Sequence, residues 1–333
     1  MAAGSRTLRK LQLGDESVQG TPVAASAIWR GRGTILDRRD VVHVEEDVGV
    51  IGGTDRSYIA RIWSELELEE VEATFEQLPY LFEMGVSAET PTQDGAGSDY
   101  IYNYLAPTTA KNTIKTYTFE GGDDIQAEEF DYGYASEIVL SGEGQGALMM
   151  AAAVRGRETT NTTFTGGLTL PSVEEILFNS GKLYIDDSGG TVGSTQVSDL
   201  LLGMNLTWNT GLQHWWAVDG SLDWNRLKQV DDEIILELTY EHTSDAVTEK
   251  GKYRSNDVRL MRLLFEGSDV ASAGTTYSKK TLIIDLSGTY EEWSNLDENE
   301  GNDIVTATLR VRQNDTDSLK ADVTIVNELS ALP

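Results

Sequence analysis

The 333-residue sequence contains no cysteine, so neither a disulfide framework nor a thiolate metal site is available to it. It has no run of about 18 apolar residues, the length that a membrane-spanning helix requires. Its first ten residues, MAAGSRTLRK, lack the apolar core of a secretory signal. We therefore expect a soluble protein, made in a cytoplasm, with no membrane partner.

Basic residues are also scarce, with 26 Lys and Arg against 55 Asp and Glu and a net charge of −29. Such a field repels duplex DNA, because phosphate contacts require Lys and Arg. Two interpretations stay open. The acidic residues line a surface past which another polyanion slides, or they reflect a source organism that lives in high salt. Lysine supplies only 10 of the 26 basic residues, which favours the second interpretation somewhat.

Histidine is rare, and the three histidines lie in different predicted strands, none at ligand spacing from another: His43, His214 and His242. The turn Asp187-Ser188-Gly189 has the local form of an aspartic protease loop. That chemistry needs two loops whose carboxylates share a proton, and the sequence offers no second one. We expect no catalytic residue and no cofactor.

An acidic segment around Gly301 weakly resembles a calcium-binding loop through Asp297, Asn299 and Asp303. It lacks the glycine and terminal glutamate of an EF-hand. We expect no dedicated metal site, while adventitious cation binding at this segment stays open.

Short strands separated by polar turns dominate the pattern, and few segments have helical spacing. Residues 58–70 alternate as a half-buried strand does, and Phe75 to Phe82 recur at helical spacing. A second helix is expected near 245–255, and a capping box of Ser172 and Glu175 predicts a short helix through Phe178. Further strands are expected near residues 34–44, 100–105, 114–120, 128–141, 146–155, 182–187, 200–209, 214–224, 233–241, 258–266, 279–287, 303–312 and 321–328.

Short sequence matches recur in the same order at offsets of 150 to 170 residues. They pair Gly31, Arg32, Ile35 and Asp37 with Gly181, Lys182, Ile185 and Asp187; LEL at 66–68 with LEL at 236–238; 115–119 with 280–284; and Arg155 and Arg157 with Arg310 and Arg312. We therefore predict a mainly β protein of two tandem β-sandwich or barrel domains, each with a short flanking α-helix. The expected division is an N-terminal arm (1–30), a first β domain (31–158), a linker (159–170), a second β domain (171–313) and a C-terminal strand or arm (314–333), which completes either its own sheet or that of a neighbouring subunit.

Tryptophans gather in the second half at Trp208, Trp215, Trp216 and Trp224. Exposed aromatic side chains at such spacing serve as sugar-binding platforms, but tryptophan in a sandwich is more often part of the core or an interface. A tandem carbohydrate-binding module is therefore one alternative. A glycosidase with paired carboxylates is a more distant one, because no acidic pair can be placed across a cleft.

Six segments resemble the major tail tube proteins of long, non-contractile-tailed (siphovirus-type) phages and viruses. They are KLQLGDESVQGTPVAASAIWRG, EEDVGVIGGTDRSYIA, ATFEQLPYLFEMGV, KTYTFEGGDDIQAEEFDYGY, LTLPSVEEILFNSGKLYID and EGNDIVTATLRVR. The resemblance extends from about residue 8 to residue 329, and its motifs are structural phrases, not catalytic ones.

The resemblance implies a tail-tube-like β-sandwich or barrel whose rings stack into a tube with a β-lined channel. Such rings usually contain six tube domains, so a chain with two would form a trimer of pseudo-sixfold symmetry. The implied partners are the chain itself, a tape-measure protein, a tail terminator and distal-tip proteins. Genome DNA passes through the lumen during ejection without specific binding. The implied location is the tail of the virion.

Two sets of residues are expected to serve this assembly. Alternating acids are candidates for the lumen wall, with a solvated outer face as the alternative: Glu65, Glu67, Glu69, Glu237 and Glu241. Protruding loops at 39–58 and 209–225 are candidates for stacking between rings. Their candidate contact residues are Asp47, Gly52, Gly53, Asp55, Trp215 and Trp216.

Overall fold

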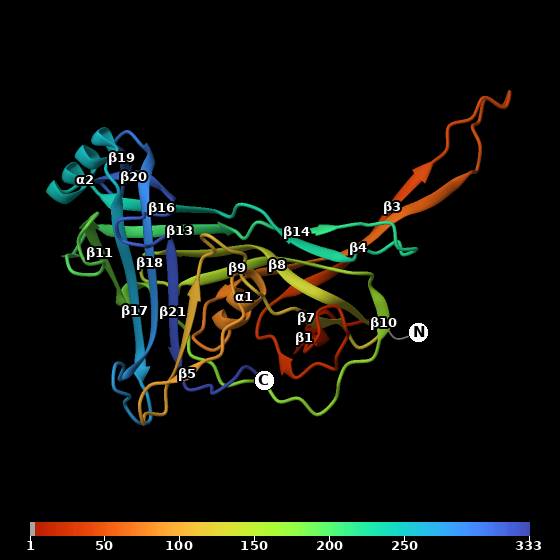
Figure 1. Cartoon of the computed structure of the whole chain (residues 1–333), viewed down its shortest axis with the longest axis horizontal. Helices are drawn as coiled ribbons and strands as arrows, with labels where there is room; N and C mark the ends of the chain where they lie inside the picture. Colours follow the sequence, from red (N-terminus) through yellow and green to blue (C-terminus); the bar gives the residue numbers. More distant parts are fainter. Residues whose placement is uncertain (1–3) are drawn as a thin grey trace.

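The computed structural model describes residues 4–333, which form antiparallel β-sheets with two α-helices (Figure 1). The helices are α1 (Leu78–Gly85) and α2 (Ser244–Ser255), and short 3₁₀ turns lie at Arg6–Leu8 and Phe178–Ser180. The strands are β1 (Lys10–Asp15), β2 (Ala27–Ile28), β3 (Gly33–His43), β4 (Ser57–Glu72), β5 (Thr92–Gln93), β6 (Tyr100–Leu105), β7 (Tyr117–Gly122), β8 (Ala127–Glu143), β9 (Met149–Gly156), β10 (Thr160–Thr162), β11 (Gly181–Asp187), β12 (Gln196–Val197), β13 (Leu201–Asn209), β14 (Leu212–Trp215), β15 (Arg226–Gln229), β16 (Glu233–Glu241), β17 (Arg259–Asp269), β18 (Lys279–Trp293), β19 (Asp297–Asn299), β20 (Asn302–Val311) and β21 (Ala321–Asn327).

An eight-stranded central sheet extends through the molecule in the order β3-β4-β9-β8-β13-β16-β20-β18. Alternation along its strands separates a buried face from an exposed one. In β4, for example, Leu66 and Leu68 are buried and Glu67 is exposed. This agrees with the pattern that the sequence predicts for residues 58–70.

Two flanking sheets branch from the central sheet through its longest strands. The N-terminal part of β8 joins the sheet β2-β1-β7-β8-β10, while its C-terminal part stays in the central sheet. The N-terminal part of β18 likewise joins β12-β11-β17-β18-β21-β6-β5. Each long strand thus forms the corner between two sheets.

Both corners are made at a glycine that is followed by a bulge. A Cβ at Gly133 would lie 2.6 Å from the carbonyl oxygen of Tyr117, and a Cβ at Gly288 would lie 2.3 Å from that of Arg310. Only glycine allows the backbones to approach this closely. In β8 the extra residue of the bulge is Ser136, and in β18 it is Glu291. The bulge increases the local twist of each strand as it passes from one sheet to the other.

The same series of pairings occurs in both halves of the chain. Strands β1, β2, β3, β4, β7, β8, β9 and β10 pair with one another as β11, β12, β13, β16, β17, β18, β20 and β21 do. The register agrees as well. Glu65 lies opposite Arg155 in the first half, and Ile235 lies opposite Arg310 in the second.

This correspondence tests the sequence matches one by one. The LEL stretches fall in β4 and β16, which occupy the same place in the two halves. Arg155 and Arg310 fall in β9 and β20, which also correspond, and Arg157 and Arg312 follow directly after the ends of these strands. The other two matches pair strands that do not correspond. Residues 31–37 lead into β3, whose counterpart is β13, but their match at 181–187 is β11. Residues 115–119 lead into β7, whose counterpart is β17, but their match at 280–284 lies in β18.

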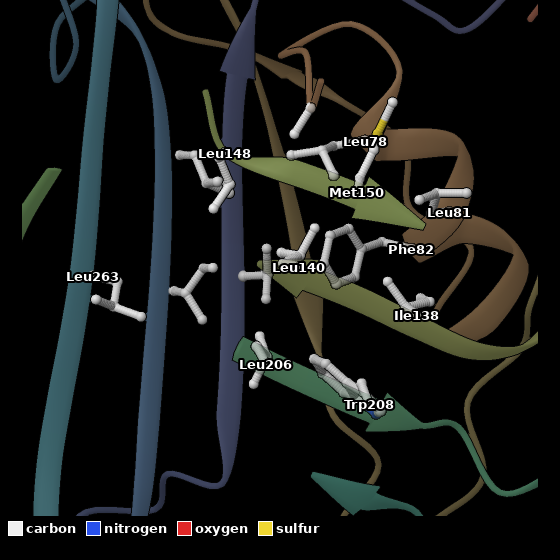
Figure 2. Packing of buried hydrophobic residues seen from close by; sticks show 14 of the residues in the cluster. Leu78, Leu81, Phe82, Ile138, Leu140, Leu148, Met150, Leu206, Trp208 and Leu263 are labelled. Carbon is white, nitrogen blue, oxygen red and sulfur yellow. The ribbon is translucent and has the colours of Figure 1, made fainter. Parts of the chain in front are cut away.

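Helix α1 covers the buried face of the central sheet (Figure 2). Its side chains Leu78, Leu81 and Phe82 point toward residues of β8, β9 and β13, and all eight of its residues are buried. The Phe82 ring meets that of Trp208 edge-on at 6.0 Å between centroids. Most of the buried apolar residues form one cluster that includes residues from Leu11 to Ile325, so the two halves share a core.

Helix α2 lies in the second half where α1 lies in the first, but it is mostly exposed. Thr243 caps its first turn by accepting a hydrogen bond from the Ala246 N–H, and Asn256 ends it in the left-handed conformation. Glu249 receives two hydrogen bonds from the guanidinium of Arg259, both at 2.9 Å and both buried. The helix predicted at 245–255 is therefore confirmed.

Several local predictions were wrong. No helix follows Ser172, because Glu175 is held as an extended bridge to Thr74 and only a 3₁₀ turn forms at Phe178. The strand expected at 214–224 ends at Trp215. The final strand β21 does not await a neighbour's sheet, since β18 and β6 of its own chain pair with its two edges. Residues expected as an arm and a linker also supply strands, namely β1, β2 and β10.

Candidate assembly surface

The exposed face of the central sheet is rich in carboxylates. Alternation places Glu65 and Glu67 of β4 and Glu237 and Glu241 of β16 on this face, away from the buried leucines between them. The structure thus puts four of the five acids that the sequence singled out on one surface, in both halves of the sheet.

Glu65 differs from the others because it is paired. Arg38 of β3 and Arg155 of β9 both bind its carboxylate at 2.9 Å. Partial burial opposes its ionisation, but hydrogen bonds from Trp63 and Arg38 outweigh this and hold the pKa of Glu65 below its ordinary value. Glu65 is therefore a fixed part of the β3-β4-β9 ladder, not a free charge.

A groove of about 870 Å³ crosses this face where β4, β9, β8, β13 and β16 lie side by side. Glu237 lies in it together with three acids that the sequence analysis missed: Glu70, Glu72 and Glu143. The amide of Asn205 donates to Glu237 at 3.4 Å, and the Ser141 hydroxyl donates to Glu70 at 2.9 Å. No Lys or Arg among residues 4–333 forms an ion pair with these four acids, so the groove carries net negative charge.

Glu69 was placed wrongly. The register of β4 against β9 shifts between Leu68 and Val71, and this bulge turns consecutive acids in different directions. Glu70 enters the acidic groove, whereas Glu69 lines a separate groove with Arg6, Arg9, Lys10 and Arg32. The sequence does contain a sign of this bulge. Glu69 and Glu70 are adjacent polar residues, and a strand that alternates strictly between a buried and an exposed face cannot expose both.

The hairpin of β3 and β4 extends beyond the rest of the molecule (Figure 1), and its connection forms the tip. Asp47, Gly52, Gly53 and Asp55 all lie in this tip, as expected from the sequence. Its exposed side chains also include the apolar residues Val48, Val50 and Ile51. The tip combines acids with an exposed apolar segment.

The second proposed loop does not project in the same way. Trp216 packs edge-on against Trp63 with 6.1 Å between ring centroids, and the Arg61 guanidinium lies 5.1 Å from its ring. The backbone N–H of Ile62 donates to the carbonyl of Leu222, which ties this loop to β4. Trp215 is half-exposed, with the Lys228 ammonium 3.7 Å from the centre of its ring. Trp216 therefore anchors the loop to its own chain, and Trp215 is the more exposed of the two tryptophans.

The tryptophans do not form a sugar-binding platform. Trp208 lies in the main core, and Trp224 lies in a smaller cluster with Tyr132 and Tyr134. The Tyr134 hydroxyl is 2.8 Å from Nδ1 of His214, and burial, followed by nearby Arg155, lowers the pKa of this histidine to about 4. His214 is thus a neutral packing residue at neutral pH.

The aspartate of the protease-like turn Asp187-Ser188-Gly189 takes part in ion pairs. Asp187 accepts hydrogen bonds from Lys252 and Arg259, which lower its pKa, so it is an ion-pair member of the α2 region. Residues 4–333 contain no group of three or more His, Cys, Asp or Glu that could hold a metal ion. No helix in this part of the chain is long and apolar enough to cross a membrane.

The central sheet contains a joint between the halves and ends in two free edges. At the joint, β8 pairs with β13 from Glu137 opposite Asn209 to Glu143 opposite Gly203. At one end β3 pairs only with β4, and at the other the C-terminal part of β18 pairs only with β20, within residues 4–333. Unpaired edges of this length expose backbone donors and acceptors and favour strand addition by another chain.

The sequence matches no protein-family model, and no curated protein matches it.

Proposed function

We propose that this chain is the major subunit of a siphovirus-type viral tail tube, a structural protein without enzymatic activity. The observation that carries the proposal is the continuous central sheet, in which two corresponding halves are already joined edge to edge by β8 and β13. A chain that joins its own halves in this way leaves the corresponding edges free at its two ends. Repetition of the same joint between chains produces a closed ring.

The number of chains follows from the resemblance to tail tube proteins. Each half is one tail-tube-like β domain with its own flanking helix, so three chains supply the six domains of a ring. Such a ring has true threefold and approximate sixfold symmetry. Eight central strands per chain give a 24-stranded barrel of about 115 Å circumference and about 37 Å backbone diameter, which strand tilt increases. A barrel of this size leaves room for duplex DNA along its axis.

The exposed face of the central sheet suits the inner wall of such a barrel. Its groove presents Glu70, Glu72, Glu143 and Glu237, with no basic partner among the described residues. Negative charge repels DNA phosphates, so the genome slides instead of binding. The remaining partners in this proposal are a tape-measure protein inside the growing tube, with a terminator and distal-tip proteins at its ends, and the site of action is the virion tail.

The proposal is tested by concentrating the purified protein, with and without its tape-measure partner, and imaging it by negative-stain microscopy. We expect hollow rods of uniform width whose end-on views have threefold symmetry. A protein that stays monomeric in both conditions would contradict the proposed function. Binding to a glycan array by a small, non-polymerising oligomer would instead favour the carbohydrate-binding alternative.

A further inference from the structure

The joint between β8 and β13 provides a template for a second contact, because each of its strands has a counterpart at a free edge. Strand β18 repeats the pairing of β8 in detail. Tyr134 opposite Arg155 becomes Thr289 opposite Arg310, and each strand has its bulge two residues later. After the bulge, Glu137 lies opposite Ala153 of β9, and Glu292 lies opposite Thr308 of β20, so Glu292 corresponds to Glu137.

Strand β3 repeats the pairing of β13 in the same way. Asn205 lies opposite Glu237 in β16, and Thr34 lies opposite Glu67 in β4. The next outward residue agrees as well, since Thr207 lies opposite Ile235 and Leu36 lies opposite Glu65. Both free edges therefore have a defined register relative to the internal joint.

We propose that β3 of one copy pairs antiparallel with the C-terminal part of β18 of the next copy, in the register of the internal joint. Glu137 opposite Asn209 then becomes Glu292 opposite Arg38. Ile138 opposite Trp208 becomes Trp293 opposite Asp37, and Val139 opposite Thr207 becomes Ser294 opposite Leu36. This contact rests on the proposed tube function and specifies its chain-to-chain interface.

The residues that this register brings together are complementary. The Glu292 carboxylate meets the Arg38 guanidinium, an attractive pair directly across an antiparallel ladder. The indole N–H of Trp293 is buried without an acceptor among residues 4–333 of its own chain, and the register places the Asp37 carboxylate opposite it. A partner that supplies this acceptor removes the cost of an unsatisfied buried donor.

A groove of about 490 Å³ lies beside this edge, lined by residues that include Tyr253, Thr289, Glu291 and Arg310. In the first half the corresponding position is filled by Thr210, whose N–H donates to the Ser136 carbonyl at 3.1 Å. The copied register puts Arg39 of the neighbouring copy in the place of Thr210, with its N–H directed at the Glu291 carbonyl. The groove is therefore the seat for the end of the incoming strand.

The absence of native cysteine permits a direct test by cross-linking of assembled rods. The double variant Leu36→Cys/Ser294→Cys should form a disulfide between chains under mild oxidation, because directly opposite residues are within disulfide reach. Within one chain these positions are seven strand spacings apart, roughly 34 Å, so any disulfide joins two chains (Figure 1). The matched control is Leu36→Cys/Glu292→Cys, a diagonal pair about 7–8 Å apart in this register, which should not link efficiently.

Denaturing gels of oxidised rods should show covalent dimers and trimers for the first variant and mainly monomer for the control. Rods of normal width without a cross-link in the first variant, or with an equal cross-link in the control, overturn this register while leaving the tube function in place. A protein that forms no rods overturns the proposed function and this interface together.

Discussion

Trp208 connects the two halves through its packing. It is buried beneath α1, opposite Ile138 in β8 and Ile234 in β16. Replacing it with alanine removes a large aromatic side chain from a position where the sheet cannot collapse. Trp208→Ala should lower the free energy of unfolding by about 3–5 kcal/mol, as measured by urea denaturation of the unassembled chain.

Trp215→Ala is the matched control, because the same side chain is half-exposed there, with the Lys228 ammonium over its ring. It should change the free energy of unfolding by less than about 1 kcal/mol. An equal loss in both variants would contradict the placement of Trp208 in a shared core.

Asp322 predicts a pH dependence with a definite sign. It lies in β21 directly opposite Asp285 of β18, and one of its oxygens is buried without a hydrogen-bond partner among the described residues. Burial, together with the neighbouring Asp285, raises the pKa of Asp322 to about 6. The carboxyl group in the unfolded chain titrates near pH 4, so below that pH Asp322 is protonated in both states and does not lower the free energy of unfolding. Between about pH 4 and 6 its ionisation progressively lowers the free energy of unfolding, and above pH 6 this loss has its full size.

Asp322→Asn should therefore stabilise the chain at pH 7.5 and not at pH 4. We expect a gain of about 1–2 kcal/mol at pH 7.5, less than the full equivalent of the pKa shift because the side chain is partly exposed. Thermal or urea unfolding at both pH values checks this. A gain of the same size at pH 4, or a loss at pH 7.5, would show that Asp322 is not held against its ionisation.

At the scale of single elements, we expect the projecting β3-β4 hairpin to form the contact between stacked rings. Its tip exposes Val50 and Ile51 beyond the packed body of the molecule, a costly arrangement unless a partner covers them. The double variant Val50→Asp/Ile51→Asp should leave the melting temperature unchanged and prevent rings from stacking into rods. Microscopy and light scattering at assembly concentrations measure this.

The control for the tip is Val247→Asp, which places a new carboxylate on the exposed face of α2. It should leave rod length unchanged. If both substitutions shorten the rods equally, added charge and not the tip contact is responsible.

Strand positions were predictable from the sequence where alternation was long and regular. The expected ranges near 100–105 and 233–241 match β6 and β16. The misses arise where backbone geometry changes within a strand. The bulge that separates Glu69 from Glu70, and the corners at Gly133 and Gly288, depend on which neighbours pair with each part of the strand. That information is non-local, so a local pattern cannot contain it.

At the scale of the whole molecule, the duplicated pairing was only partly visible in the sequence. The LEL stretches, and Arg155 and Arg310, lie in corresponding interior strands of the central sheet. The other matches aligned strands that do not correspond, since short β-branched and charged segments recur by chance. The shared core, with β6 of the first half paired to β21 of the second, could not be inferred from two similar halves.

The acids on the exposed face of the central sheet predict how assembled rods interact with DNA. Glu67 and Glu237 occupy the same position in the two halves and face the proposed lumen without a basic partner among the described residues. Glu67→Lys/Glu237→Lys should leave rods intact but make them retain fluorescent duplex DNA, with retention lost as salt rises. The control Asp269→Lys/Asp315→Lys makes the same change of charge at exposed positions outside this sheet face, so its rods should exclude DNA as the unmodified rods do. Equal retention by both variants would show that net charge alone governs DNA binding and that these glutamates do not line the lumen.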